Sequence, residues 1–162
     1  MDIDTKQKLY FDTTIPNYLF APTRPDRMEA TWRLWERCKD GEYEIFVSDL
    51  FFTELRKCYQ PKLGKMFEQL NLITFEQLEV SVEATELAAE YIRKGAFVPK
   101  SGNDSLHVAL AVVEGGCDLV LSWNFHQTRS WTTDIIKEVN LLHRYKGIEI
   151  LQPDDFLEGR FK

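Results

Sequence analysis

The chain has 162 residues, 44% of them apolar and 28% charged, which fits one globular domain and leaves little room for a second. Its longest apolar runs, such as residues 106–113, fall far short of the roughly 20 residues that a membrane-spanning helix needs. The net charge of −6 and the pI of about 5.1 argue against a stand-alone DNA-binding module, because phosphate affinity comes mostly from Lys and Arg. They argue less strongly against a nuclease, whose carboxylates hold cations.

The cysteines, Cys38, Cys58 and Cys117, are widely spaced and form no CxxC pair or Cys/His cluster with zinc spacing. Each lies among apolar neighbours, so we expect reduced, buried thiols, as in a reducing cytosol. The N-terminal segment lacks the apolar stretch behind a basic start that defines a signal peptide. We therefore expect a cytoplasmic protein with a single domain over residues 1–162.

Short apolar runs alternate along the chain with longer segments of helical periodicity. The pattern predicts strands at residues 9–11, 43–47, 73–80, 118–122 and 148–151. It predicts helices at residues 14–20, 25–41, 48–58, 61–70, 82–95, 103–116 and 132–147. Thr14 and Ser48 are candidate N-caps, and Gly41 is a helix stop signal. Residues 153–155, Pro-Asp-Asp, predict a solvated turn after the last strand.

Strands that alternate with helices, and that are short apolar runs without polar alternation, are typical of a parallel sheet covered on both faces. We therefore predict an α/β domain with three layers, α/β/α, around a central, mostly parallel sheet of four to five strands. In open sheets of this type, ligands bind beyond the carboxyl ends of the strands, where the strand order reverses. The residues that follow each strand are therefore the first candidates for a functional site.

Polar residues that could ligate a metal occupy such positions. Asp12 directly follows the first strand, and Asn124 follows the fourth. Glu54 lies about a turn and a half into the helix after the second strand, and Asp104 opens the apolar helix that precedes the fourth. Three carboxylates and an amide could thus converge at one edge of the sheet. Oxygen ligands of this kind suit Mg²⁺ or Mn²⁺, which would relieve the carboxylate repulsion and could activate water for attack on phosphorus.

Each of these residues also has a plain structural interpretation. Asp12 and Asn124 could be turn residues, and Asp104 could simply cap its helix. Glu54 could be a solvated glutamate on a helix surface. His107 lies three residues after Asp104 on roughly the same face, so a hydrogen-bonded core histidine or a partner of Asp104 is favoured over a metal ligand. Any one of these signals is weak alone.

Taken together, the segments resemble the PIN-domain family. The resemblance covers nearly the whole chain and rests on four stretches: LYFDTTIPNYL (9–19), VSDLFFTEL (47–55), NDSLHVALAVVEGGCDLVLSWNF (103–125) and the tail IIKEVN with IEILQPDDF (135–156). The third stretch is the most specific, because an acidic residue opens a buried helix and an apolar strand then leads into W-N-F. The resemblance implies a parallel sheet with an acidic pocket.

The resemblance also implies a role for particular residues. Asp12, Glu54 and Asp104 match the three carboxylates found in nearly all members, and Asn124 stands where a fourth acid is common. Thr13 and Ser48 match hydroxyl residues that support the ligands or contact substrate. Family members are typically Mg²⁺- or Mn²⁺-dependent ribonucleases, and many bacterial ones are toxins held inactive by an antitoxin. The expected partners are thus an RNA substrate, an antitoxin protein and a second copy in a homodimer. Asn124 has one negative charge fewer than Asp, so one ion could bind where other members bind two.

Three function classes remain open at this point. In the first, a metal-dependent ribonuclease, basic residues could guide the RNA backbone, although solvated faces explain them equally well: Arg56, Lys57, Lys100 and Arg129. The second is a phosphatase of the haloacid-dehalogenase type with Asp12 as nucleophile, but that chemistry needs an acid two positions later, and residue 14 is Thr. The third is a PIN fold that serves only as a binding or regulatory module.

Overall fold

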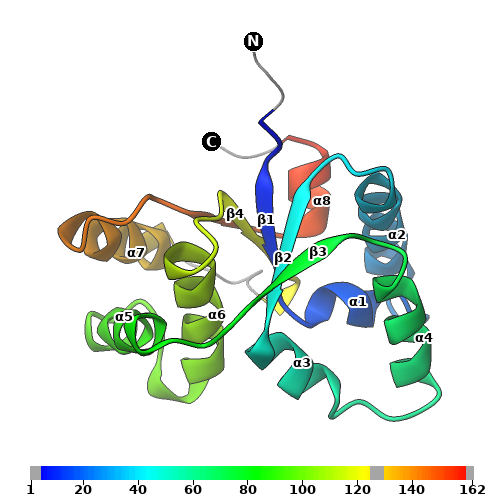
Figure 1. Cartoon of the computed structure of the whole chain (residues 1–162), viewed down its shortest axis with the longest axis horizontal. Helices are drawn as coiled ribbons and strands as arrows, with labels where there is room; N and C mark the ends of the chain where they lie inside the picture. Colours follow the sequence, from blue (N-terminus) through cyan, green and yellow to red (C-terminus); the bar gives the residue numbers. More distant parts are fainter. Residues whose placement is uncertain (1–4, 125–129, 160–162) are drawn as a thin grey trace.

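A five-stranded parallel sheet forms the centre of the protein, whose computed structural model describes residues 5–124 and 130–159 (Figure 1). The strands are β1 (Lys8–Phe11), β2 (Glu44–Ser48), β3 (Phe75–Leu78), β4 (Leu119–Leu121) and β5 (Glu149–Leu151). Their order across the sheet is β3-β2-β1-β4-β5, and each neighbouring pair is parallel. The chain therefore builds the sheet outward from β1 in one direction, then returns and continues on the other side of β1.

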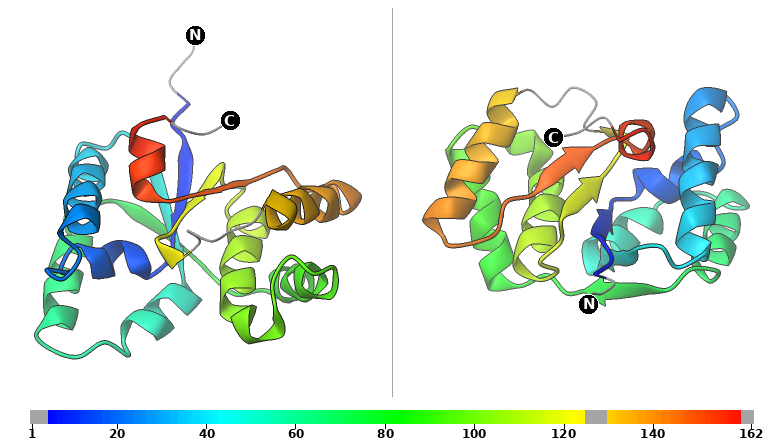
Figure 2. Two further views of the ribbon diagram at one scale, coloured as in Figure 1. Left: turned by 180° about the vertical axis from the view of Figure 1, so that it is seen from behind. Right: turned by 90° about the horizontal axis from the view of Figure 1, so that it is seen from above.

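Helices cover both faces of this sheet (Figures 1 and 2). On one face lie α5 (Val82–Arg93), α6 (Gly102–Val113), which follows the short 3₁₀ helix η1 (Pro99–Ser101), and α7 (Ser130–Leu142). The opposite core is formed by α1 (Thr14–Tyr18), α2 (Pro25–Lys39), α3 (Asp49–Leu55), α4 (Lys62–Leu70) and α8 (Pro153–Leu157). The predicted three-layer α/β/α architecture is confirmed. Within residues 5–124 and 130–159, no helix is both long and apolar enough to cross a bilayer.

Consecutive residues of β1 contribute to two separate cores. Leu9 and Phe11 pack with α2 and α4, whereas Tyr10 packs with α5 and α6. All three side chains are fully buried, which explains why the strand is a continuous apolar run. Burying a side chain of this size contributes about 1.5–3 kcal/mol. Tyr10 differs in carrying a hydroxyl group, which needs a hydrogen-bond partner at such depth.

Two of the three predicted helix boundary signals act as expected. The Ser48 hydroxyl caps α3 by accepting a hydrogen bond from the Phe51 backbone N–H at 3.2 Å. Gly41 follows α2 with a φ of +76°, the left-handed conformation that ends many helices. Thr14, however, is the first residue of α1, while Thr13 occupies the cap position without a side-chain hydrogen bond. The Thr14 hydroxyl is used elsewhere, as described below.

The segment after β5 is a helix, so the predicted solvated turn is wrong. Pro153 lies in the first turn of α8, where backbone N–H groups make no hydrogen bond within the helix, so the lack of an N–H in proline costs nothing. Asp154 and Asp155 lie in the same turn, where the helix dipole favours negative charge. Phe156 is buried and packs on the Tyr43 ring, with centroids 5.4 Å apart. Burial of this aromatic side chain stabilises the helix, which the turn-forming residues 153–155 do not predict by themselves.

The cysteines are free thiols, but only two of the three are buried. Burial raises the pKa of the Cys38 and Cys117 thiols, so both are protonated and unreactive at neutral pH. Cys58 follows α3 and is half-buried. The expectation of a buried thiol is therefore wrong for this residue.

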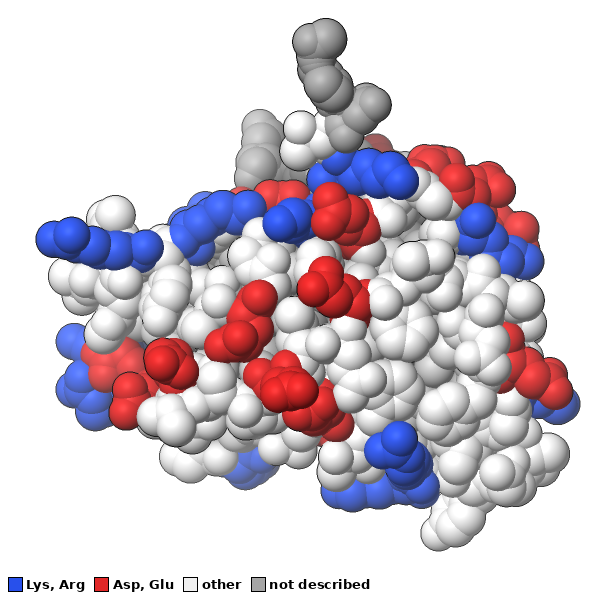
Figure 3. Space-filling model, viewed as in Figure 1, with Lys and Arg blue, Asp and Glu red and all other residues white. Residues whose placement is uncertain are grey.

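The edge strand β3 lies on the face shown in Figure 3, where acidic side chains gather in the middle and basic ones lie toward the rim. Exposed acids of β3, the loop after it and α5 include Glu76, Glu79, Glu83 and Glu86. Exposed charges on an edge strand discourage pairing with the strands of another molecule. A polyanion would also be repelled by this face.

The buried side chain of Asn140 in α7 joins two segments, and its loss should destabilise the fold. Its Oδ1 accepts a hydrogen bond from the Tyr91 hydroxyl, and its Nδ2 donates to the Lys146 carbonyl at 3.1 Å. Asn140→Ala leaves the buried Tyr91 hydroxyl without this partner and removes the bond to the Lys146 carbonyl, so we expect the free energy of unfolding in urea to fall by about 1–3 kcal/mol. The control Leu141→Ala, at a position that is 77% exposed, should change it by less than about 0.5 kcal/mol. Equal losses in the two variants would contradict this role of Asn140.

Candidate functional site

The site lies where the strand order reverses, at the carboxyl ends of β1 and β4. Asp12 directly follows β1, and Ser122 directly follows the adjacent strand β4. The chain extends the sheet from β1 toward β3 on one side and from β4 to β5 on the other, so β1 and β4 flank the switch point. This is the position at which the strand pattern predicted a ligand site.

Asp12 is buried and fully engaged by neighbouring donors. Only 2% of its surface is exposed. Its Oδ1 accepts hydrogen bonds from the Thr14 backbone N–H at 3.0 Å and from the Thr14 hydroxyl at 2.5 Å, and its Oδ2 accepts one from the Ser122 hydroxyl. Burial raises the pKa of Asp12 above its usual range, although these hydrogen bonds offset part of the effect. The hydrogen bonds therefore fix the orientation of the Asp12 carboxylate, whereas its burial removes contact with water that would stabilise the charge.

The same two hydroxyl groups organise the loop after β4. The Thr14 Oγ1 accepts a hydrogen bond from the Trp123 backbone N–H at 2.9 Å, and the Ser122 Oγ accepts one from the Asn124 backbone N–H at 3.0 Å. Asn124 is thus tied to the site through its backbone, while its side chain is exposed. Thr13 is half-buried, and its carbonyl accepts hydrogen bonds from Asn17.

Glu54, in α3, is held from both sides. Its Oε1 lies 2.8 Å from His107 Nε2, and its Oε2 accepts a hydrogen bond from Asn103 Nδ2 at 2.9 Å. The side chain of Glu54 is 21% exposed, whereas that of His107 is 2% exposed. Partial burial raises the pKa of Glu54, but the hydrogen bonds from His107 and Asn103 outweigh it, and the pKa lies below its usual range. Glu54 is therefore ionised at neutral pH.

His107 connects Glu54 to the interior. Its Nδ1 lies 2.6 Å from the Tyr10 hydroxyl, which in turn lies 2.7 Å from the Ser48 hydroxyl. Tyr10, Ser48 and His107 are all buried. The partner carboxylate of His107 is Glu54, and no His107 hydrogen bond to Asp104 is present.

Asp104, in the first turn of α6, differs from the other two acids. Among the described residues, it receives no hydrogen bond. Burial, repulsion from Asp12 and, more weakly, repulsion from Glu54 raise its pKa. The residue lines a surface hollow of about 400 Å³ together with residues 99–103. Asp104 is therefore an accessible carboxylate in a field of negative charge.

The electrostatic coupling shows which predicted residues lie near one another. Repulsion from Asp12 and from Glu54 raises the pKa of Asp104, so these three acids, which lie in or next to three different elements, are near one another in the folded chain. The described side chains do not form a closed coordination group, since no three His, Cys, Asp or Glu residues among residues 5–124 and 130–159 lie close enough to hold an ion. The chemistry of the donors suits a hard divalent cation, but binding would have to draw the side chains together.

Several residues of the network were not predicted as site residues. The signal for Thr14 and Ser122 was a hydroxyl residue just beyond each of two strands, a pattern that also fits turns. Tyr10 carries no signal, because a tyrosine in an apolar strand looks like any core aromatic. Asn103 directly precedes Asp104, and only the folded chain brings it to Glu54.

The basic residues singled out in the sequence have mixed surroundings. Lys57 lowers the pKa of Glu54 through its charge, and Lys100 lines the hollow beside Asp104. Arg56 lies over the Phe52 ring, 5.5 Å from its centroid. Arg129 and Phe125 lie outside the described residues.

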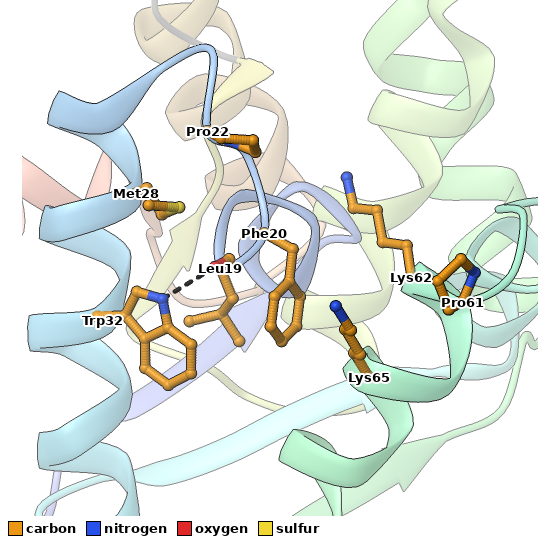
Figure 4. A pocket seen from close by; sticks show the side chains of 8 residues that line it. All are labelled: Leu19, Phe20, Pro22, Met28, Trp32, Pro61, Lys62 and Lys65. Atoms are coloured by element: carbon orange, nitrogen blue, oxygen red, sulfur yellow. Dashed lines mark hydrogen bonds between the residues drawn. The ribbon is translucent and has the colours of Figure 1, made fainter.

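A second hollow, of about 480 Å³ and mainly apolar, lies between α2, the start of α4 and the segment that follows α1 (Figure 4). It is lined by Leu19, Phe20, Pro22, Met28, Trp32, Pro61, Lys62 and Lys65. We call it the α2–α4 groove. The Trp32 Nε1 donates to the Leu19 carbonyl at 2.9 Å, which leaves the indole ring as part of the wall (Figure 4). The ammonium groups of Lys62 and Lys65 extend along the opposite wall.

Comparison with known proteins supports the fold. No family model matches the sequence, and no curated protein is significantly similar to it in sequence. A chain in the crystal structure of VapBC2 from Rickettsia felis bound to a promoter DNA fragment aligns over 90% of this chain and 98% of its own length, with a TM-score of 0.53 and 15% identity. A chain of DNA-bound VapBC from Salmonella typhimurium aligns over 91% and 98%, with a TM-score of 0.53 and 18% identity. At these identities the comparison establishes the PIN-like α/β/α fold.

The strained charge of Asp104 predicts a gain in stability when it is removed. A raised pKa means that the folded chain holds its proton more tightly than the unfolded chain, so stability is lost as the pH rises from about 4 through the raised pKa. In chelator at pH 7, Asp104→Asn should therefore unfold at a higher temperature, by roughly 2–4 °C for each kcal/mol gained. The gain should shrink as the pH falls toward 4.

Asp118→Asn is the matched control. Although burial raises the pKa of Asp118, the Lys146 ammonium, 2.8 Å away, outweighs it and lowers the pKa. Removing this charge should not stabilise the fold. An Asp104→Asn variant that melts no higher than the wild type at pH 7 would contradict the prediction.

Proposed function

We propose that the chain is a ribonuclease that hydrolyses RNA phosphodiester bonds with the help of Mg²⁺ or Mn²⁺. One observation carries the proposal: Asp12 follows β1, Glu54 lies in α3 and Asp104 lies in α6, and Asp104 is held near the other two although its charge is disfavoured there. Proteins retain strained charges of this kind mainly where function requires them.

The free lone pairs of the carboxylates suggest which atoms would hold an ion. Asp12 Oδ1 already accepts two hydrogen bonds, but its Oδ2 accepts only one. Each oxygen of Glu54 accepts one hydrogen bond, and those of Asp104 accept none from the described residues. Asp104 and Asp12 Oδ2 would therefore be the direct ligands, with Glu54 as a further ligand or as an acceptor for an ordered water.

When bound, such an ion would make water a stronger nucleophile at neutral pH and would stabilise negative charge on the phosphate. The chain itself supplies orientation. Thr14 and Ser122 hold Asp12, and His107 and Asn103 hold Glu54. These contacts keep the carboxylates fixed, so little reorganisation is needed during the reaction.

The charge distribution favours a path for RNA near α6. The face around β3 is acidic and would repel a phosphate backbone (Figure 3). Lys100 lies beside Asp104, and Lys57 is close enough to influence Glu54. We propose that these lysines help to position a single strand over the carboxylates.

Cleavage of a mixed-sequence single-stranded RNA tests the proposal. With Mn²⁺ or Mg²⁺ we expect cleavage by the wild type that chelator abolishes. Asp104→Asn and Asp12→Asn should each reduce the rate by at least about 100-fold, because the loss of supporting partners alone costs 10- to 100-fold at metal sites. Glu83→Gln, an exposed acid on α5, is the control and should cleave at the wild-type rate after identical purification.

Each other outcome favours a different class. Metal-dependent cleavage that survives Asp104→Asn would mean a contaminating nuclease or a different site. Metal binding without any cleavage would favour a PIN-fold binding module. A phosphorylated Asp12 trapped with a phosphomonoester would favour the phosphatase alternative.

We further propose that the chain is the toxin of a toxin–antitoxin pair and that the antitoxin binds in the α2–α4 groove. The two similar structures are VapBC complexes. The groove is apolar with two lysines on one wall, which suits an amphipathic segment that carries acidic residues. An apolar anchor in the groove would supply most of the affinity, and the lysines would favour acidic partners.

Co-expression with the product of the adjacent reading frame tests this partner. We expect a complex in which RNA cleavage is inhibited. The double variant Lys62→Glu, Lys65→Glu should weaken the complex by at least tenfold in isothermal titration calorimetry, since charge complementarity is reversed while the carboxylate site is untouched. Its cleavage rate without the partner should equal that of the wild type. Unchanged affinity would contradict binding in this groove.

A further inference from the structure

A chain of hydrogen bonds runs from the interior to Glu54. It passes from Ser48 at the end of β2 to Tyr10 in β1, to His107 in α6 and to Glu54 in α3, with successive distances of 2.7, 2.6 and 2.8 Å. Ser48 and Tyr10 are fully buried and His107 nearly so, whereas Glu54 is 21% exposed. This series of hydrogen bonds therefore begins in the core at Ser48 and reaches solvent at Glu54.

The donor and acceptor of each bond can be assigned by chemistry. A carboxylate oxygen of Glu54 accepts, so His107 Nε2 donates to it. With one proton on the ring, Nδ1 is an acceptor and the Tyr10 hydroxyl donates to it. The Ser48 hydroxyl donates to Tyr10 and accepts from the Phe51 N–H. With donors and acceptors assigned in this way, every polar atom of the series has a hydrogen-bond partner, as buried polar groups require.

The network is more elaborate than the packing of the core requires. Tyr10 lies among apolar side chains of α5 and α6, where phenylalanine would fill nearly the same volume. A buried histidine and tyrosine stabilise a core only if all their polar atoms are paired, and the last partner in this series is the carboxylate of Glu54. The arrangement orients one acid of the site.

We propose that His107 is a positioning residue that holds Glu54 in its functional orientation, and that Tyr10, itself hydrogen-bonded to Ser48, anchors the opposite side of the imidazole at Nδ1. The proposal rests on the proposed function, in which Glu54 belongs to the metal site. Partners that orient ligands from behind typically change metal affinity 10- to 100-fold. A histidine that only fills the core would affect stability but not metal affinity.

Two substitutions separate the positioning role from a role in core packing. Each provides a polar atom near only one of the two ring nitrogens of His107. His107→Gln can place an amide N–H near the position of Nε2 and still donate to Glu54. His107→Asn can accept from Tyr10 near the position of Nδ1 but is too short to reach Glu54. We expect His107→Gln to keep Mn²⁺ affinity within about threefold and His107→Asn to lose 10- to 100-fold, measured by electron paramagnetic resonance on variants with matched melting temperatures.

The tautomer is measured directly by ¹⁵N NMR of the imidazoles at neutral pH without metal. The His107 signals are those missing from the His107→Gln spectrum, and we expect a protonated Nε2 and an unprotonated Nδ1. Tyr10→Phe removes the donor to Nδ1, so the Nδ1 signal should shift while Nε2 stays protonated by its bond to Glu54. Tyr91→Phe, which removes another buried tyrosine hydroxyl on the same side of the sheet, should leave the His107 signals unchanged.

The two measurements can fail separately. A neutral His107 that carries its proton on Nδ1 and not on Nε2, or equal Mn²⁺ affinity for His107→Asn and His107→Gln, would overturn the positioning role. Absence of Mn²⁺ binding by the wild type would contradict the proposed function instead, while the tautomer measurement would still decide whether His107 donates to Glu54.

Discussion

Asp12 occupies a position where an ionised carboxylate is costly, because it lies beneath the surface at the end of the central strand. Hydrogen bonds from Thr14 and Ser122 offset part of that cost. The same two hydroxyls accept backbone N–H groups from the loop after β4, so the conformation of that loop depends on the charge they stabilise. Orientation of the acid and shape of the loop are thus two results of one set of contacts.

This constraint also separates the function classes. A phosphatase would need Asp12 as an exposed nucleophile with an acid two residues later, but Thr14 stands there, and its hydroxyl already bridges Asp12 and the Trp123 N–H. A pure binding module would gain nothing from holding Asp104 against the repulsion of Asp12 and Glu54. A cation between the three would turn that repulsion into attraction, which favours the nuclease proposal.

The sequence was sufficient for features that depend on local patterns. Buried strands appear as apolar runs, and Ser48 and Gly41 mark helix ends through backbone chemistry that is the same in any fold. The sequence was insufficient where a side chain bonds to a residue that is distant along the chain. The imidazole of His107 bonds to Glu54, 53 positions away, although Asp104 is only three residues away. Helix α8 forms because Phe156 packs on a distant tyrosine, which the polar residues before it do not reveal.

The acids along β3 have a consequence for assembly. Two copies joined edge to edge at β3 would bring Glu76 and its neighbours face to face, and the repulsion would be strongest at low ionic strength. If the chain associates with itself, the contact is therefore expected away from β3, at the helices or at the other edge strand, β5. Salt would then affect the dimer far less than it would affect a sheet joined at β3.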